Sequence, residues 1–243
     1  MVRLIPILAA AVLLSGCGGV WLPETVERRA GDLLEPKVLE ELPLAAGNRW
    51  APFLDDAGRK LAAVSERPDY GYRFRIVRSK QVNALALPNG DIFVTEELLR
   101  VAGRDAEAVA AVLGHEIGHV ARRHSAETLQ SKIGIDAAGI LVFGIDRSLA
   151  RAVASLGAQL MELGYGRDME LEADLCAIRY LVRLGYPPAT GLKFLKVLAA
   201  REHEEASAIE RYLRSHPPTA ERLRYAQAYA ERLAAEAGEA KPR

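Results

Sequence analysis

The pattern His-Glu-x-x-His, which begins at His115, constrains the fold of this chain more than any other feature. Residues four positions apart on an α-helix differ by about 40° in direction, so His115 and His119 share one face and can bind one metal ion. Glu116 lies between them in angle, where a carboxylate can act as a general base. The preceding residues 109–113 are all apolar and supply the apolar run of an amphipathic helix that follows the sheet. We therefore expect a helix over residues 105 to about 124 that carries a metal site.

A catalytic zinc ion normally has three protein ligands and an open fourth position. His124 lies five residues beyond the second histidine, which turns it about 140° along the helix and away from the ligand face. A better third ligand comes from the helix expected over residues 169–184, where Glu170 and Asp174 share a face and Glu172 points roughly opposite. We predict that Glu170 binds the metal and that Asp174 accepts a hydrogen bond from a ligand imidazole. The alternative is an acidic helix start exposed to solvent.

Strand-like alternation precedes the metal motif. Tyr72, Phe74 and Ile76 alternate with other residues, and the segments 82–87 and 91–95 flank a Pro-Asn-Gly turn, which predicts a hairpin with a third strand nearby. Strands followed by helices predict an α+β domain, in which a small, mostly antiparallel sheet is followed by a helical bundle that carries the metal helix. Besides those already named, the expected helices cover residues 53–64, 148–163 and 189–201 and begin again at residue 219.

The first 17 residues have the features of a secretory signal, with a positive charge at Arg3, an apolar run over residues 4–14, and the sequence Leu-Ser-Gly-Cys that ends at Cys17. These last four residues resemble a bacterial lipobox, which implies that Cys17 becomes the lipidated N-terminus. Several acyl chains on one residue anchor a protein stably to a membrane. Gly18 stands where inner-membrane lipoproteins usually have Asp, so the same resemblance favours the outer membrane. The alternative is an ordinary secretory signal with an incidental cysteine.

These features divide the chain into a signal peptide over residues 1–16, a tether with one or two short helices over residues 17–50, and a metal-binding domain over residues 51–243. The apolar run over residues 133–145 is too short to span a membrane, which favours a buried segment or a mobile flap and leaves contact with a lipid surface open.

Composition excludes several classes of protein. The 32 Lys and Arg residues balance the 32 Asp and Glu residues, and a neutral chain is not expected to bind nucleic acid. Two cysteines make a disulfide framework unlikely as an organising feature, and Cys176, in an apolar helical stretch, is expected to be an inert core thiol. His203 is surrounded by glutamates and is expected on a solvated helix face.

Several motifs together resemble one family of zinc peptidases. The motifs are Asn83-Ala84 before Pro88-Asn89-Gly90, Gly114-His115-Glu116-Ile117-Gly118-His119-Val120, Arg123-His124-Ser125, Glu170-x-Glu172-Ala173-Asp174, and His216-Pro217-Pro218-Thr219-Ala220-Glu221-Arg222. On these motifs the chain is identified as a member of gluzincin metallopeptidase family forty-eight, the HtpX, Oma, BepA and LoiP group, from about residue 53 to residue 222. We expect a short bacterial lipoprotein member, without the transmembrane helices or tetratricopeptide repeats of other members.

The resemblance implies a zincin-like fold and one Zn²⁺ per chain, bound by His115, His119 and Glu170, with Glu116 as the general base. It also implies that His216 is a histidine that in some relatives moves onto the open position of the metal and silences the site.

The resemblance further implies that Arg222 steadies an oxyanion and that Asn83 and Ala84 line the substrate cleft, where an extended peptide adds to the sheet edge. Without the resemblance, His216 would be a surface loop residue, Arg222 a charge on a helix face, and Asn83 and Ala84 an ordinary strand.

The function implied is a membrane-tethered zinc endopeptidase that hydrolyses unfolded or misassembled cell-envelope proteins at the periplasmic face of the outer membrane. Its partners would be unfolded polypeptides, the membrane through the lipid on Cys17, and the outer-membrane assembly machinery. The alternative is a holdase or assembly factor whose zinc site is kept latent, although a pure binding protein has no need for a base at Glu116. A structural zinc site is disfavoured because it would have four closed ligands.

Overall fold

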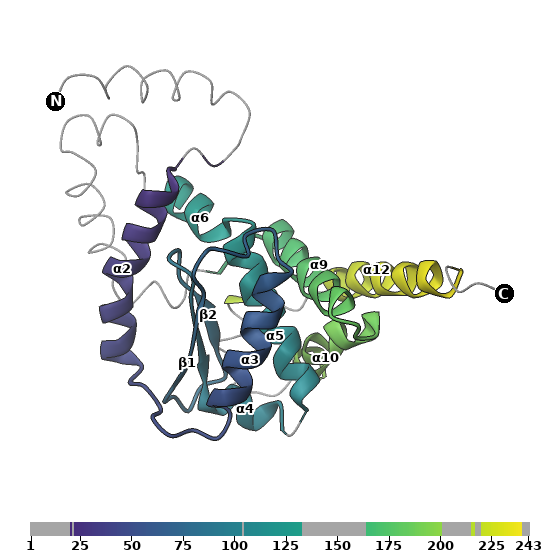
Figure 1. Ribbon diagram of the computed structural model, residues 1–243, viewed down its shortest axis with the longest axis horizontal. Helices are drawn as coiled ribbons and strands as arrows, with labels where there is room; N and C mark the ends of the chain where they lie inside the picture. Colours follow the sequence, from purple (N-terminus) through teal and green to yellow (C-terminus); the bar gives the residue numbers. More distant parts are fainter. Residues whose placement is uncertain are drawn as a thin grey trace, which may run out of the picture.

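The computed structural model describes residues 20, 22–103, 105–132, 164–200, 215–216 and 220–239 (Figure 1). Several predictions lie outside these residues and stay predictions. They concern the signal peptide, Cys17, the apolar run over residues 133–145, the helix over residues 148–163 and His203.

A sheet of three strands forms the centre of the fold, in the order β1-β3-β2. The strands are β1 (Arg73–Val77), β2 (Ala84–Ala86) and β3 (Asp91–Thr95). β2 and β3 form the predicted antiparallel hairpin, and Gly90 in its turn has a φ of 91°, a conformation that favours glycine. β1 pairs with β3 in parallel. The sheet is therefore mixed rather than mostly antiparallel, because β3 and not β2 is the neighbour of β1.

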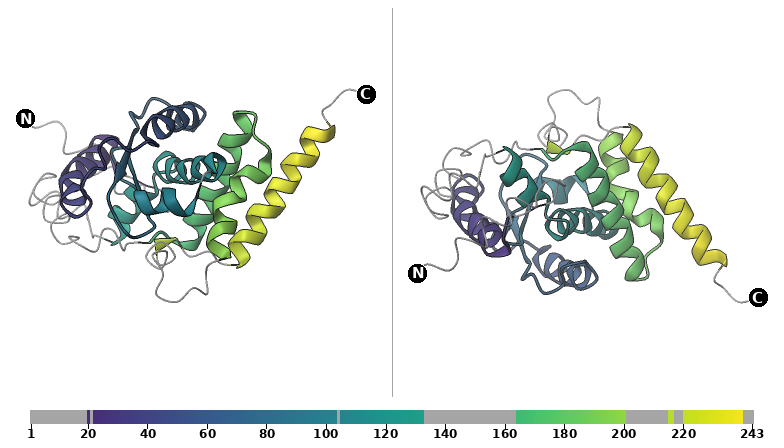
Figure 2. Two further views of the ribbon diagram at one scale, coloured as in Figure 1. Left: turned by 90° about the horizontal axis from the view of Figure 1, so that it is seen from below. Right: turned by 90° about the horizontal axis from the view of Figure 1, so that it is seen from above.

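β3 takes the central position because both of its faces are buried. Phe93 contacts the apolar cluster that includes α2 (Glu24–Glu41), whereas Ile92 and Val94 belong to the main core with α3 (Ala51–Ala63) and α5 (Ala106–Ala121). Figure 2 shows the layers that result, with α2 on one side of the sheet and α3 and α5 on the other. The metal-motif helix α5 thus lies in the interior of the predicted α+β domain, buried on more than the one face that an amphipathic helix would bury.

The region predicted as a tether contains a long helix that packs on the domain. The 18 residues of α2 present an apolar face of side chains spaced four apart, namely Val26, Ala30, Leu34 and Val38. This face contacts the side of the sheet that includes Val77 and Phe93. The prediction of one or two short helices in a tether is therefore corrected for residues 22–42. Pro36, which suggested a loop, is accommodated on the exposed face of α2.

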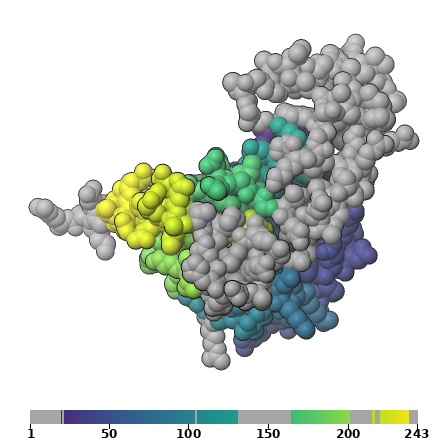
Figure 3. Space-filling model, turned by 180° about the vertical axis from the view of Figure 1, so that it is seen from behind, coloured from purple at the N-terminus to yellow at the C-terminus, as the bar shows by residue number. Residues whose placement is uncertain are grey.

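The remaining helices follow the sheet, which confirms the predicted order of elements. They are α4 (Glu96–Val101), α6 (His124–Lys132), α9 (Arg167–Arg183), the 3₁₀ helix η2 (Pro188–Leu192), α10 (Lys193–Ala199) and α12 (Ala220–Glu239). α9 packs along α5, and α12 lies outside α9 and η2, at one edge of the molecule (Figure 3). In the described part of the chain, each helix is too short or too polar to cross a membrane.

Candidate metal centre

α5 begins with a strong cap and carries both histidines of the motif on a buried face. The side chain of Asp105 accepts hydrogen bonds from the N–H groups of Glu107 and Ala108, which satisfies two of the free donors of the first turn. His115 and His119 are 5% and 0% exposed, and their Nε2 atoms lie 3.0 Å apart. The helical spacing therefore brings the two imidazoles together as predicted.

α9 brings the third predicted ligand to the same point. Glu170 lies in its first turn, with Oε2 3.5 Å from Nε2 of His115 and Oε1 3.4 Å from Nε2 of His119. Gly114 and Gly118 on α5 allow this close approach, because a Cβ atom on Gly118 would lie 2.9 Å from Cβ of Cys176 on α9. Cys176 is buried in this helix contact, as expected for a core thiol.

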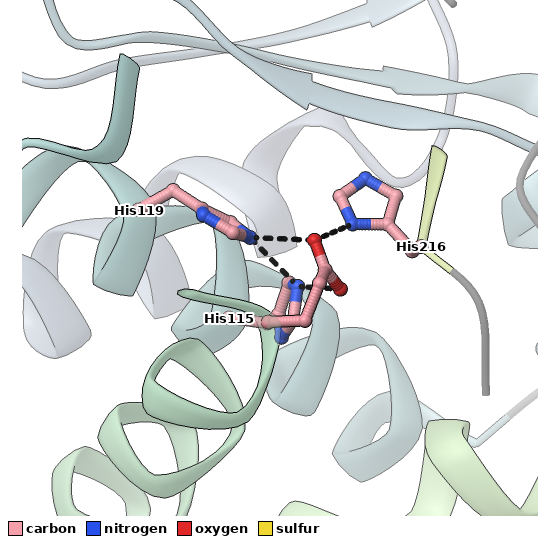
Figure 4. Close-up of side chains that lie close together, drawn as sticks. His115, His119 and His216 are labelled. Atoms are coloured by element: carbon pink, nitrogen blue, oxygen red, sulfur yellow. Dashed lines mark hydrogen bonds and ion pairs between the residues drawn. The ribbon is translucent and has the colours of Figure 1, made fainter. Parts of the chain in front are cut away.

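His216 completes a cluster of four side chains. One ligand atom from each of His115, His119, Glu170 and His216 lies within 4.8 Å of the others, and all four residues are buried. Figure 4 shows the three imidazoles grouped around one carboxylate. Nitrogen and carboxylate oxygen are the ligand atoms that zinc prefers after thiolate sulfur, so the residues present fit a zinc ion.

Glu116 lies buried beside this cluster. It is 0% exposed, and within the described residues neither of its carboxylate oxygens has a hydrogen-bond partner. Nε2 of His216 lies 3.9 Å from Oε1. Burial raises the pKa of Glu116 above its ordinary value. A buried carboxylate with raised pKa and free lone pairs is suited to accept a proton.

Asp174 contacts the ring of His115. Its Oδ1 lies 2.9 Å from Nδ1 of His115, the nitrogen that faces away from the cluster. Burial alone would lower the pKa of His115, but the neighbouring carboxylates of Asp174 and Glu170 raise it to about 10. These two carboxylates therefore stabilise the charged form of the His115 imidazole.

Arg222 contacts two carboxylates of the site. Its guanidinium donates to both oxygens of Asp174, with Nη2 2.9 Å from Oδ1, and Nη1 lies 2.7 Å from Oε2 of Glu170. Arg222 is 5% exposed. These contacts fix two carboxylates, and the oxyanion role that the family resemblance implies for Arg222 stays a prediction.

His216 contacts the ligand carboxylate directly. Its Nδ1 lies 2.8 Å from Oε1 of Glu170, and the residue is 3% exposed. The reading of His216 as a surface loop residue is therefore excluded, and its position fits a histidine that can occupy the metal site.

The comparison with known families follows this geometry. A family model described as Peptidase family M48 matches residues 50–230. The chain belongs to peptidase family M48. This confirms the family predicted from the motifs, and with it the zincin-like type of the α+β fold.

Curated relatives of this M48 chain are longer proteins. It is 27% identical over 217 residues to the beta-barrel assembly-enhancing protease of Yersinia pestis, covering 84% of this chain and 44% of that protein. It is 32% identical over 157 residues to the metalloprotease LoiP of Escherichia coli, covering 63% and 60%. It is 31% identical over 156 residues to the mitochondrial metalloendopeptidase OMA1 of Arabidopsis thaliana, covering 64% and 31%. The chain thus matches less than two thirds of each of these relatives.

Two residues of this M48 site escaped the sequence prediction. Tyr165 stacks on His119, with ring centroids 3.8 Å apart, and its hydroxyl lies 2.8 Å from Oγ of Ser125. His124 lies 2.9 Å from His119, between their Nδ1 atoms, although helical spacing turned it away. The glycines on both sides of Tyr165 could have indicated an unusual backbone conformation there. For His124 the sequence offers no such sign, because no glycine or proline stands where the helix breaks.

The predicted substrate residues lie at the edge of the sheet. Ala84 begins β2, the strand at the end of the order β1-β3-β2, and Asn83 precedes it. The backbone of Asn83 is held by Thr95, whose hydroxyl both accepts from its N–H and donates to its C=O at 3.0 Å. Oδ1 of Asn83 has no hydrogen-bond partner in the described chain. An edge strand with a fixed backbone is compatible with the predicted role.

Proposed function

We propose that this chain is a zinc-dependent endopeptidase. One observation carries the proposal: two imidazole nitrogens and the Glu170 carboxylate converge, and beside them lies the buried carboxylate of Glu116, whose oxygens have no hydrogen-bond partner in the described chain. His115, His119 and Glu170 would hold the zinc ion, as a catalytic site with three protein ligands requires. A structural site has no use for this buried carboxylate.

The chemistry proposed is hydrolysis of a peptide bond. When bound, zinc lowers the pKa of a water molecule toward 7 and polarises a carbonyl group. Glu116 accepts the proton of the attacking water and later donates it to the leaving amine, and burial favours this by raising its pKa. Asp174 fixes the ring of His115, and Arg222 fixes the carboxylates of Asp174 and Glu170.

The contacts of His216 favour a second, latent form of the site. Its imidazole lies against Glu170 and 3.9 Å from Glu116, so it occupies the space beside the base. A chain held in this form would bind substrates without cutting them, as a holdase or assembly factor does. We propose that the peptidase is the primary function and that His216 restrains it.

Two further parts of the proposal concern substrates and location. We propose that unfolded or misassembled envelope proteins bind as extended strands beside Asn83 and Ala84, because an edge strand can accept another strand. We also propose that Cys17 is lipidated and anchors the protein at the periplasmic face of the outer membrane. The name of the Yersinia relative, a beta-barrel assembly-enhancing protease, supports the outer-membrane assembly machinery as a partner.

The domain division is proposed with one change from the sequence prediction. The signal peptide stays at residues 1–16, and lipidation stays at Cys17. The packing of α2 on the sheet supports joining residues 22–50 to the peptidase domain, which leaves a shorter tether than residues 17–50.

The test compares the purified protein with Glu116→Gln and His216→Ala variants on an unfolded polypeptide, with zinc content measured for each. We expect Glu116→Gln to keep zinc and to lose activity by about 10²- to 10⁴-fold, since it removes the general base. We expect a chelator to stop cleavage and His216→Ala to accelerate it. If all three proteins bind one zinc ion and none cleaves, the peptidase proposal is wrong and the binding function replaces it.

A further inference from the structure

A second imidazole lies behind the metal ligand His119. Nδ1 of His124 is 2.9 Å from Nδ1 of His119, and Nε2 of His124 is 3.1 Å from Oε2 of Glu172. His124 is 2% exposed, and the Glu172 side chain is 38% exposed and also pairs with Arg122. A continuous chain of contacts therefore runs from His119 to the protein surface.

The chemistry of imidazole fixes the direction of this chain. A histidine that binds a metal through Nε2 carries its proton on Nδ1, so Nδ1 of His119 must be the donor. Nδ1 of His124 is then the acceptor, which leaves the proton of a neutral His124 on Nε2, where it is donated to Glu172. Each nitrogen in this series is therefore a donor, an acceptor or a metal ligand. Each hydrogen bond of the series then contains one proton.

The fold places His124 by ending α5 at Ala121, three residues before His124. The helix has its C-cap at Arg122, and Arg123 has a φ of 63°, in the left-handed region that a residue with a side chain rarely adopts. This conformation reverses the chain and returns His124 to the side of the ligands. The sequence prediction that His124 turns away assumed that the helix continues.

Contacts with α2 hold Arg123 in this unfavourable conformation. Its Nε lies 3.0 Å from Oε2 of Glu27, a residue that is 1% exposed, and its Nη2 donates to the backbone oxygen of Leu22. Glu27 is also paired with Arg67 at 3.0 Å. A left-handed conformation is unfavourable for a residue with a side chain and persists only when the surrounding contacts determine it.

We propose that His124 is a positioning residue for the metal site, which fixes the ring and proton position of His119 while Glu172 fixes His124. His115 is held directly by the carboxylate of Asp174, whereas His119 reaches its carboxylate through one intervening imidazole. The inference rests on the proposed metal site, because the direction of the hydrogen bonds follows from Nε2 of His119 binding the ion.

The experiment measures metal affinity of the full chain in detergent, by competition with a chromophoric chelator, for the wild type and three variants. His124→Ala removes the acceptor, and we expect it to weaken Zn²⁺ and Co²⁺ binding by about 10- to 100-fold. His124→Asn places an amide oxygen near the position of Nδ1, so we expect it to recover part of this loss. Glu172→Gln removes the negative charge at the surface end of the chain of contacts. Asp168→Asn changes an exposed carboxylate on the same helix and is the matched control.

Spectroscopy distinguishes positioning from a general loss of stability. We expect the visible spectrum of the Co²⁺ form to change in His124→Ala and to return toward wild type in His124→Asn. Nitrogen NMR of the zinc form should show the proton of His119 on Nδ1 and that of His124 on Nε2. Equal affinity and an unchanged Co²⁺ spectrum in His124→Ala would overturn the proposal, as would a proton on Nδ1 of His124.

The failure of this inference can be told apart from the failure of the proposed function. A wild-type protein that binds no metal overturns both, whereas a wild type that binds metal as tightly as His124→Ala overturns the inference alone. If His124→Ala does not fold, Glu172→Gln decides: affinity indistinguishable from that of Asp168→Asn counts against the chain of contacts, and weaker affinity supports it.

Discussion

Arg222 connects the two carboxylates on which the site depends. Its guanidinium contacts Glu170, a predicted ligand, and Asp174, which holds His115. All of these groups are buried, so the positive charge of Arg222 compensates negative charge that water does not reach. Burial would raise the pKa of Asp174, but Arg222 and His115 lower it below its ordinary value.

We expect Arg222→Gln to lower the free energy of unfolding of the metal-free protein by about 3–5 kcal/mol, because it removes the cation from buried ion pairs. Urea unfolding in the presence of a chelator measures this. Arg224→Gln, an exposed position on the same helix, is the control and should change the free energy by less than about 0.5 kcal/mol. Equal stability of the two variants would instead support the oxyanion role that the family resemblance implies.

The sequence predicts which residues of the site lie together when both belong to one regular helix. His115 with His119, and Glu170 with Asp174, are four apart, and the helix period alone puts each pair on one face. His124 and Tyr165 could not be found in this way. The position of His124 depends on a left-handed residue that is held by contacts from α2, which is distant in the sequence.

Two helices, α5 and α9, carry three of the four side chains of the metal cluster, and glycines set the separation of the helices. A Cβ atom on Gly118 would lie 2.9 Å from Cβ of Cys176 and 3.2 Å from Cα of Ala173. One of these contacts is with backbone, which cannot move aside cheaply. The distance between the histidines and Glu170 therefore depends on the absence of side chains at this interface.

We expect overpacking in Gly118→Ala to lower the free energy of unfolding by about 1–3 kcal/mol. This loss outweighs the gain of about 1 kcal/mol that comes from the higher helix propensity of alanine. The substitution should also weaken zinc binding, because α9 carries Glu170. Gly166→Ala is the matched control, since a Cβ there meets no atom within 4 Å. Thermal unfolding and zinc titration of both variants test this, and a Gly118→Ala protein as stable as wild type would contradict it.

The carboxylate of Glu66, which precedes β1, contacts two side chains of α9. Tyr180 donates to Oε2 of Glu66, and Nη2 of Arg179 lies 3.3 Å from Oε1. Burial alone would raise the pKa of Glu66, but the hydrogen bond from Tyr180 and the charge of Arg179 lower it. A carboxyl group with a lowered folded pKa adds stability above its unfolded pKa and loses it as pH falls through the folded pKa.

We therefore expect the stability difference between wild type and Glu66→Gln to be largest near pH 7 and to shrink as pH falls below about 4.3. Urea unfolding at several pH values, with chelator present, measures this. Tyr180→Phe removes the hydrogen-bond donor and should show the same trend. A difference that does not vary with pH would mean that the charge of Glu66 contributes nothing.

Some helices and strands could be predicted from the sequence, and others could not. The hairpin and the metal helix followed from turn residues and periodicity. α2 was missed because three prolines suggested a tether, although Val26, Ala30, Leu34 and Val38 are spaced four apart. The pairing of β1 with β3 depends on which strand is buried on both faces, and alternation within one strand does not reveal this.

In the molecule as a whole, α2 connects the sheet to the C-terminal end of α5, because it packs on the sheet and contacts Arg123. Glu27 joins three parts of the chain through Arg67 and Arg123. We expect Glu27→Gln to lower the free energy of unfolding by about 3–5 kcal/mol, since it leaves two arginines without their buried partner. Glu24→Gln, on the same helix at an exposed position, should cost no more than about 1 kcal/mol.

Urea unfolding of the two variants provides the measurement. Limited proteolysis offers a second one, because loosening α2 should expose its peptide bonds to a protease before the remainder of the domain is cut. If α2 were a passive tether, both variants would unfold at the same urea concentration as wild type.

The packing of α2 would limit how far the active site can move from a membrane if Cys17 carries the lipid that we propose. Leu22 is 1% exposed and belongs to the cluster under α2, so the domain begins there. If Cys17 carries the lipid, as we propose, the five peptide units from Cys17 to Leu22 can extend at most about 18 Å. That length is shorter than the hydrocarbon core of a bilayer, which is about 30 Å thick. An enzyme anchored in this way would reach only a thin layer at the membrane surface, and the proteins that stay in that layer longest would be its substrates.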